Sequence, residues 1–340
     1  MARIWMSGLE AGHIDIFDSS NAATISAAQA RTGTYSFLIG TLGSVNAAFP
    51  APETEIFGRI GIRSTYGAVI GGFGNGLLRL YDNAGGSQIV ILLSYYTNTI
   101  FVRRGAINGT VIGVGGILHQ NRWQCMEFRL LVDNAAGVFQ LKVDGTLVID
   151  FAGDTQNTAN ADVLGFRIGW TEAVGPASAG YYDDIAFNNV GGGVNDSWIG
   201  RGGIPAIFPE GVGNSTDLGL FPNGGEANWE DVDEKPPDDD TTYVFDDVID
   251  EHDSYETGDL PVTGTIAAVQ WLARARSDLV GAPEIARILR IGGVDYQGAD
   301  VGIDVAYDYR KEIFDEDPDA GPGAWTVAAI NGMEIGVKVR

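Results

Sequence analysis

Two glutamates in the second half of the chain have the spacing of a catalytic carboxylate pair. Glu251, Asp253 and Glu256 form the pattern E-x-D-x-x-E. Retaining glycoside hydrolysis needs two carboxyl groups about 5 to 5.5 Å apart, and alternate positions on a bulged strand can supply that separation. The intervening residues are polar, however, and further aspartates flank the motif. We therefore expect a solvated loop here, with catalysis by Glu251 and Glu256 or a cation site as the alternatives.

Metal-binding patterns are scarce in the sequence. The chain has three histidines and one cysteine, without H-E-x-x-H or C-x-x-C, so no structural zinc is expected. Calcium prefers carboxylate oxygens, which makes Glu10 with Asp183 or Asp184 one candidate set and the acidic stretch 231–256 another. Because acids at strand ends are usually just solvated, we expect neither a bound metal nor a cofactor.

Motifs for nucleophilic or phosphate chemistry are also missing from the sequence. No G-x-S-x-G pattern occurs, and none of the four lysines follows a glycine, so neither a nucleophile elbow nor a Walker loop is present. Cys125 has no histidine near it in the sequence, which predicts a buried structural thiol.

Aromatic residues offer a different kind of site. Sugar rings stack on exposed aromatic side chains over the face of a sheet. The residues that could provide such a platform are Tyr95, Tyr96, Trp170, Tyr181 and Tyr182. We expect each of them to pack in a core or an interface, and the sugar platform is the alternative.

Composition and charge limit the class of partner. The 340 residues carry a net charge of −24, and the acidity is uneven: residues 1–193 have a net charge of −4 and residues 194–340 of −20. Phosphate recognition draws on clustered Lys and Arg, so nucleic acid is not an expected partner. No apolar run is long enough for a signal peptide or a membrane span, and we expect no membrane insertion.

The first half shows the period-two pattern of strands, separated by turn residues, without a capped helical pattern. A hairpin is predicted over 138–151, with the three-residue turn Val143-Asp144-Gly145 closed by Gly145 as a G1 bulge. The residues that this register places together in one core are Phe139, Leu141, Leu147 and Ile149.

The second half begins after a glycine-rich stretch. Residues 193–203 predict a linker, which separates a first domain at 1–192 from an acidic β-rich domain at 204–340. Residues 264–280 fit either a helix or a strand, and we favour a strand. Residues 284–298 are then its predicted partner, with a Gly-Gly turn. Strands at 304–314 and within 324–340 complete an all-β fold.

The order of landmarks in the first half resembles one fold family. Trp5 to Glu10 reads W-x-x-G-L-E, Trp123 begins the strand before the hairpin, and the half ends on Asp183-Asp184-Ile185. Together with the Asp144-Gly145 turn, this order resembles the concanavalin A-like, laminin G-like jelly roll. The resemblance implies a two-layer antiparallel sandwich. Retaining glucanases of that fold share the E-x-D-x-x-E spacing, but with apolar residues at the x positions.

The second half resembles proteins of tailed-phage virions. The similar segments are the G-G-x-x-Y-x-G loop at 292–298, DPDAGPGAWT at 317–326 and INGMEIGVKV at 330–339. The resemblance implies a bacteriophage structural protein, assembled in the host cytoplasm and carried on the virion as a capsid decoration, fibre or tail component.

We therefore expect a non-enzymatic virion protein, an N-terminal concanavalin A-like jelly-roll sandwich followed by a second, acidic β-sandwich. Its expected partners are other virion proteins, copies of itself in a homo-oligomer, and host surface glycans. A carbohydrate-binding host-receptor adhesin and a glycoside hydrolase that uses Glu251 and Glu256 are the alternatives.

Overall fold

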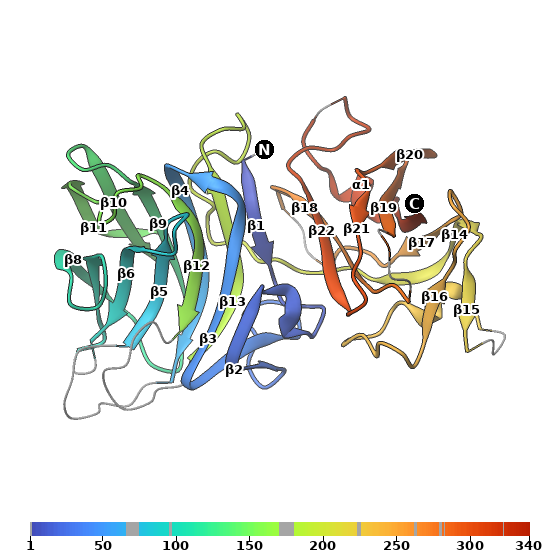
Figure 1. Ribbon diagram of the computed structural model, residues 1–340. Coiled ribbons are helices and arrows are strands. Elements are labelled where there is room, and N and C mark those ends of the chain that lie inside the picture. The colour runs from blue at the N-terminus through green and yellow to red at the C-terminus, as the bar shows by residue number, and fades with distance from the viewer. Residues whose placement is uncertain are drawn as a thin grey trace. The chain divides into compact units, whose positions relative to one another are not determined.

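The structure is a computed structural model that describes residues 2–65, 75–94, 97–169, 180–222, 226–261, 264–278, 281, 283–321 and 323–340. These residues are nearly all β, which confirms the predicted fold class. They divide into two compact units, Met1–Glu10 with Ile14–Ile204 and Ala11–His13 with Pro205–Arg340. Figure 1 labels the elements of both units.

The strands of the first unit pair in an antiparallel order with β11 and β8 at its two ends: β11-β10-β9-β4-β13-β3-β12-β5-β6-β7-β8, with β1 beside β13 and β2 beside β3. The bounds of its elements are β1 (Arg3–Ser7), the 3-10 helix η1 (Ile14–Ile16), β2 (Ser19–Ser26), β3 (Ser36–Glu53), β4 (Glu55–Ser64), β5 (Asn75–Tyr81), β6 (Ser87–Leu93), β7 (Thr99–Arg104), β8 (Thr110–Ile117), β9 (Trp123–Leu131), β10 (Gly137–Val143), β11 (Thr146–Gly153), β12 (Val163–Gly169) and β13 (Gly180–Asn189).

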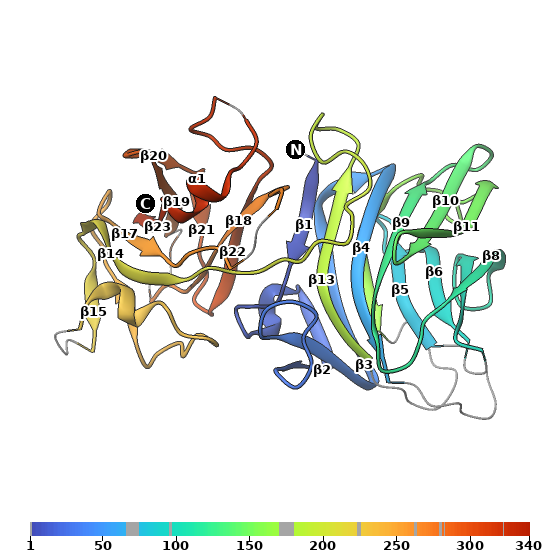
Figure 2. The same cartoon turned by 180° about the vertical axis from the view of Figure 1, so that it is seen from behind.

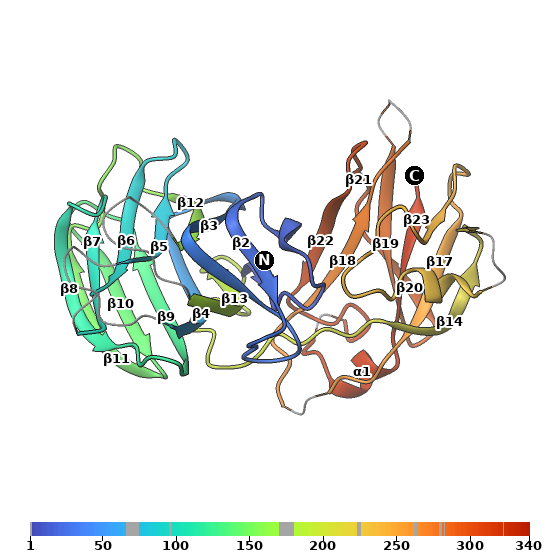
Figure 3. The same ribbon diagram turned by 90° about the horizontal axis from the view of Figure 1, so that it is seen from below.

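The long strand β3 joins the two layers of this unit. Its first residues pair with β13, and its residues from Ser44 onward pair with β12. The other ends of the layers also meet, since a Cβ on Gly113 of β8 would lie 2.4 Å from Cγ2 of Ile149 on β11. Figure 3 shows the strands β5 to β7 facing β9 to β11. The result is the sandwich of jelly-roll type that the sequence predicts.

Aromatic rings from both layers fill the space between them. Phe166 of β12 stacks on Phe187 of β13 with ring centroids 4.4 Å apart, and Trp5 packs edge-on against Phe166 at 5.0 Å. Phe128 of β9 packs against Phe187 from the other side. These rings are buried, and burial of such large apolar areas is the main favourable term in folding.

The hairpin of β10 and β11 differs from the predicted register. Val143 is opposite Thr146, so the turn is only Asp144-Gly145, with φ of +50° and +84°, as in a type I′ turn. The bulge lies further along β11, between Leu147 and Ile149. The predicted three-residue turn and its G1 bulge are therefore wrong.

The displaced bulge also corrects the predicted core of the hairpin. Ile149 still meets Leu141, and both are buried with Phe139. Leu147 instead lies opposite Lys142 and is 46% exposed. The period-two pattern placed it in the core because one extra residue in β11 reverses the side that every earlier residue faces.

We expect Gly145→Ala to destabilise the first unit by about 1–2 kcal/mol. No heavy atom lies within 4 Å of the added Cβ, so the effect comes from the positive φ alone. Urea unfolding measures it. Gly191→Ala is the matched control, because that glycine is outside the positive-φ set and has room for a methyl group. Equal stability of the two variants contradicts the assigned turn.

Residues 193–203, which the sequence predicts to be a linker, pack on the first unit. Gly200 N donates to Glu127 Oε1 at 2.7 Å, and Asn188 Nδ2 donates to the carbonyl of Ser197 at 2.9 Å. The Trp198 ring contacts Phe57, with centroids 5.6 Å apart. Figure 2 shows this segment running from β13 across the first unit. The boundary between the units falls after Ile204.

The second unit contains a main sheet and two ribbons. The sheet order is β14-β17-β23-β19-β20, with β21 beside β19, and the ribbons are β15-β16 and β18-β22. The bounds are β14 (Pro209–Thr216), β15 (Gly219–Phe221), the 3-10 helix η2 (Asn228–Asp231), β16 (Tyr243–Phe245), β17 (His252–Thr257), β18 (Val269–Ala275), β19 (Glu284–Ile291), β20 (Val294–Gln297), β21 (Val301–Gly302), β22 (Asp308–Phe314), α1 (Val327–Asn331) and β23 (Glu334–Val339).

The uncertain segment 264–280 contains the strand β18, as favoured, but its partner is β22 and not 284–298. Residues 284–298 form their own hairpin, β19-β20, around the predicted Gly292-Gly293 turn. The ribbon β18-β22 packs on the sheet through Trp271, whose Nε1 donates to the carbonyl of Gly336 at 3.1 Å. Within 324–340, the short helix α1 precedes the terminal strand.

Candidate functional site

Arginines from three strands lie in one row on the outer face of the first unit. Arg167 of β12 is opposite Arg79 of β5. Val90 of β6 is opposite both Arg79 and Arg103 of β7, and so lies between them. Neighbouring strands are about 4.8 Å apart, so Arg103 is roughly 10 Å from Arg79 along the row. We call Arg79, Arg103 and Arg167 the arginine row; Figure 3 shows its strands side by side.

Strand alternation places these side chains outward. Phe166 and Ile168, which flank Arg167, are fully buried in the core, and so are Leu78 and Leu80 on either side of Arg79. Successive residues of a strand point to opposite faces of the sheet. The three arginines are therefore on the face turned away from the core, where each is half-buried.

Hydrogen bonds fix the direction of each guanidinium. Arg167 Nε donates to Asn46 Oδ1 at 2.6 Å, Arg79 Nη2 donates to the carbonyl of Gly85 at 3.2 Å, and Arg103 Nη1 donates to the carbonyl of Gly109 at 2.9 Å. A guanidinium presents a planar fork of N–H donors, which suits carboxylate, sulfate or phosphate oxygens.

An apolar floor lies beside the row. Val90 and Leu92 of β6 point to the same outer face, yet they are 1% and 3% exposed. Ile107, from the turn after β7, and Phe101 pack against them. These apolar side chains are packed beneath the outer face, so they support the strands that carry the row and expose almost no surface of their own.

Tyr81 lies beside the row on β5, two residues after Arg79. Its hydroxyl donates to the carbonyl of Ala47 at 3.0 Å. Burial raises the pKa of Tyr81 and the nearby Asp18 raises it further, whereas Arg167 and Arg79 act in the opposite direction. The tyrosine thus stays neutral within electrostatic reach of two members of the row.

A polar network anchors the chain after β11 to strands of this layer. Asp82 Oδ2 accepts from Thr158 Oγ1 at 2.6 Å and from Asn160 Nδ2 at 3.1 Å, while Oδ1 accepts from the amides of Ala84 and Gly86. Desolvation raises the pKa of Asp82, but these hydrogen bonds outweigh it, so the net pKa is lowered. The turn that holds Gly85, the acceptor of Arg79, is fixed by this carboxylate.

The structure describes only part of the alternative sugar platform. Tyr95, Tyr96 and Trp170 lie outside the described residues. Tyr182 is 1% exposed and stacks on Phe37 at 5.3 Å, so it packs in the core, as expected, and cannot serve as a platform. Tyr181 is half-buried on β13, opposite Arg63.

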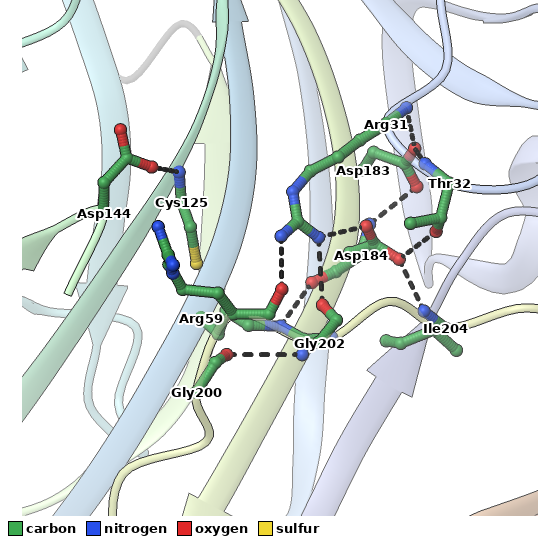
Figure 4. A network of polar contacts seen from close by, with 11 residues as sticks. Arg31, Thr32, Arg59, Cys125, Asp144, Asp183, Asp184, Gly200, Gly202 and Ile204 are labelled. Carbon is green, nitrogen blue, oxygen red and sulfur yellow. Dashed lines mark hydrogen bonds and ion pairs between the residues drawn. The ribbon is translucent and has the colours of Figure 1, made fainter. Parts of the chain in front are cut away.

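The two aspartates of the Asp183-Asp184-Ile185 segment belong to a structural network (Figure 4). Asp184 Oδ1 accepts from Thr32 Oγ1 at 2.7 Å and from the Ile204 amide at 2.6 Å, and its Oδ2 pairs with Arg31. Arg59 Nε donates to the backbone carbonyl of Asp184 at 3.0 Å. These bonds attach the segment before β3 and the end of the unit to β13.

The carboxylates considered for calcium are engaged by protein donors. Glu10 accepts from the amides of Thr34 and Tyr35, at 2.7 and 3.2 Å. Asp183 accepts from the Arg31 and Asp184 amides, both at 2.7 Å. Among the described residues, no group of three or more His, Cys, Asp or Glu side chains is arranged to hold a metal ion.

The buried carboxyl group of Asp183 should make the stability of the first unit depend on pH. Burial and the neighbouring Asp184 raise its pKa from 3.8 to about 8. The folded state therefore holds this proton more tightly than the unfolded state. The resulting stabilisation is complete below roughly pH 4 and is lost as the pH rises through about 8.

We expect the free energy of unfolding of the first unit to fall between roughly pH 5 and 8. Urea unfolding at a series of pH values, monitored by hydrogen exchange of peptides from β13, measures this free energy. Asp183→Asn carries no titrating carboxyl, so its stability should depend less on pH across this range. Identical slopes for the variant and the parent contradict the assignment.

The predicted carboxylate pair does not converge. β17 pairs with β23 from His252 to Glu256 without a bulge, so His252 and Glu256 lie on the same face of the sheet. Glu251 precedes His252 and therefore lies on the opposite face from Glu256. The segment is also a central strand and not the expected solvated loop. Asp253 is buried and accepts from the Leu218 amide at 2.9 Å and Asn228 Nδ2 at 2.6 Å. The geometry gives no support to a retaining hydrolase here.

The sequence did not reveal the arginine row. A partial signal was present, since Arg79 and Arg167 each stand between apolar residues in a strand pattern, whereas Arg103 is followed by Arg104. What joins them is the pairing of β12 with β5, two strands that are far apart in the sequence.

Among the described residues, no helix has the length and apolarity needed to cross a membrane.

No known protein family matches the chain, and no curated protein matches it. Solved structures share its β architecture at low identity. "Cellulose induced protein, Cip1" is 16% identical over 58% of this chain and 100% of its own, with a TM-score of 0.45. Domain 4 of AbnA, a GH43 extracellular arabinanase from Geobacillus stearothermophilus solved with arabinotriose, is 11% identical over 55% and 92%, with a TM-score of 0.40.

A phage protein is also similar. The carbohydrate esterase vb_24B_21 from the Shiga toxin-encoding bacteriophage phi24B is 14% identical over 50% of this chain and 88% of its own, with a TM-score of 0.36. The arabinanase domain was solved with a carbohydrate bound, and the phage protein is described as a carbohydrate esterase. At these scores the similarity does not extend to ligands or activity.

Proposed function

We propose that the protein is a non-enzymatic structural component of a bacteriophage virion whose jelly-roll unit binds acidic glycans. The observation that carries the glycan-binding role is the arginine row: Arg167, Arg79 and Arg103 aligned across β12, β5 and β7 in a chain with a net charge of −24. The row brings three positive charges together on neighbouring strands, an arrangement that is complementary to an anionic ligand.

The chemistry of the face favours a saccharide that carries carboxylate or sulfate groups. Arginine forks bind these groups through two parallel hydrogen bonds. The half-buried ring of Phe101, which packs on Val90 and Leu92, can contact the C–H face of a sugar ring. Nucleic acid is less suited, because its phosphate backbone is bound by larger clusters of Lys and Arg than three arginines provide.

The virion role rests on the motifs of the second half. In the structure, two of these motifs touch: the Tyr296 hydroxyl donates to Asp319 Oδ1 at 2.7 Å, and a Cβ added to Gly292 would lie 3.1 Å from Asp319 Oδ2. Segments 292–298 and 317–326 therefore form one local feature, which supports treating them as a single module.

A glycan array tests the proposed ligand. We expect the purified protein to bind glycans that carry uronate or sulfate and not their neutral counterparts, and binding should weaken as salt rises. Binding to neutral glycans alone, or to none, would overturn the glycan-binding role. Antibody labelling of purified virions tests the location, and labelling confined to free cytoplasmic protein would overturn it.

A further inference from the structure

A small ribbon in the second unit carries aromatic side chains on its outer face. β15 and β16 pair with Phe221 opposite Tyr243 and Gly219 opposite Phe245. Directly opposed residues share a face, as do residues two apart on a strand. The face therefore holds Phe221, Tyr243 and Phe245, and we call these residues the aromatic ribbon.

The three rings pack against one another, and the two phenylalanines are exposed. Phe221 and Tyr243 stack with centroids 4.8 Å apart, and Phe245 lies edge-on to Tyr243 at 6.1 Å. Phe221 is 43% and Phe245 52% exposed. Gly219 leaves the space that the Phe245 ring occupies, since a Cβ there would lie 3.1 Å from that ring.

The exposed rings lie on strands with a clear alternation of inward and outward side chains. The opposite face of the ribbon carries Leu220 and Val244, which are half-buried. Alternation thus puts the smaller aliphatic side chains inward and the larger aromatic ones outward, the reverse of what burial alone favours. Just beyond Phe245, Val248 and Ile249 are 50% and 67% exposed. Exposed apolar side chains gathered in so short a stretch of chain are typical of interaction sites.

The surroundings are strongly acidic. Residues 209–259, which include both strands of the ribbon, contain 17 Asp or Glu and a single Lys. Asp246 and Asp247 follow Phe245 directly, and Asp247 is exposed. A second copy of this face would bring like charges together, which costs several kcal/mol at an interface.

We propose that the aromatic ribbon is a docking surface for a protein partner whose contact patch has an apolar centre and a basic rim. The rings supply the anchors that dominate binding energy at interfaces. The acidic rim supplies complementarity and speeds association at low salt. This inference does not depend on the glycan-binding role of the first unit.

Fluorescence anisotropy with synthetic peptides tests the inference on the full chain. The probe is a labelled peptide of alternating arginine and leucine, compared with arginine-serine and glutamate-leucine peptides. We expect the arginine-leucine peptide to bind at least about tenfold more tightly than either control, with an affinity that falls as salt rises.

Variants locate the binding. Phe245→Ser and Ile249→Ser should each weaken binding about tenfold, and Asp247→Asn should reduce the salt dependence. Ile249 and Asp247 lie outside the strands, so their variants keep the ribbon intact. Val294→Ser, at a residue 50% exposed on β20, is the matched control and should bind as the parent does.

Two results would overturn the inference. One is equal affinity for the three peptides, or an affinity that Ile249→Ser does not lower together with a salt dependence that Asp247→Asn does not reduce. The other is self-association, seen by sedimentation, that the same variants abolish, because a second copy of the chain would then cover the surface.

Discussion

Replacing Asp184 by alanine is expected to lower the free energy of unfolding of the first unit by about 3–5 kcal/mol. The side chain is fully buried, accepts from Thr32 and the Ile204 amide, and pairs with Arg31. Removal of the carboxylate leaves the Arg31 guanidinium, 15% exposed, without its counterion. Breaking a buried pair costs more than making it gains, because the remaining charge stays desolvated.

Urea unfolding measures this loss, with Asp150→Asn as the control. Asp150 is exposed on β11 and accepts a hydrogen bond from Gln140, so its variant should change stability by less than about 0.5 kcal/mol. A loss below about 1 kcal/mol for Asp184→Ala would mean that the network in Figure 4 does not hold the unit together.

The second large effect is on ligand binding. The double variant Arg79→Gln, Arg167→Gln should weaken the affinity for an acidic oligosaccharide by about a hundredfold or more. Hydrogen bonds to charged groups contribute about 1.5–3 kcal/mol each, and 1.4 kcal/mol corresponds to a factor of ten. Isothermal titration calorimetry measures the affinity. Stability should change little, because both side chains lie on the outer face.

Two further variants sharpen this test. Arg167→Lys keeps the charge but loses the fork, so its affinity should lie between those of the parent and Arg167→Gln. Arg122→Gln removes a cation of the same unit whose side chain is 64% exposed and lies outside the row, and it should bind as the parent does. Equal losses for Arg122→Gln and Arg167→Gln would indicate a general charge effect and not a site.

The strands of the first unit could be predicted because its core residues alternate with outward residues over most of their length. The landmark order also located the jelly roll. The hairpin turn could not be settled, since the two-residue and three-residue turns around Asp144-Gly145 differ only in where one bulge falls. The pattern favoured the register that buried Leu147, whereas the chain exposes it.

Sites were harder to predict than strands, for two physical reasons. Arg79 and Arg167 belong to strands that are distant in the sequence, and only the antiparallel pairing of β5 with β12 brings them together. Tyr182 follows Tyr181 on one strand, so alternation sends one ring into the core, and the sequence alone did not show which. Asp184, at a φ of +50°, sits at an irregularity in β13 that a period-two pattern does not reveal.

The most direct test of the central claim is an NMR titration of the arginine Nε–H resonances with an acidic oligosaccharide, assigned by single Arg→Lys variants. Binding at the arginine row predicts that the resonances of Arg79, Arg103 and Arg167 shift together and saturate, while those of Arg122 and Arg310 do not move. Saturable shifts confined to other arginines, or no shift at concentrations where calorimetry detects binding, would contradict the account.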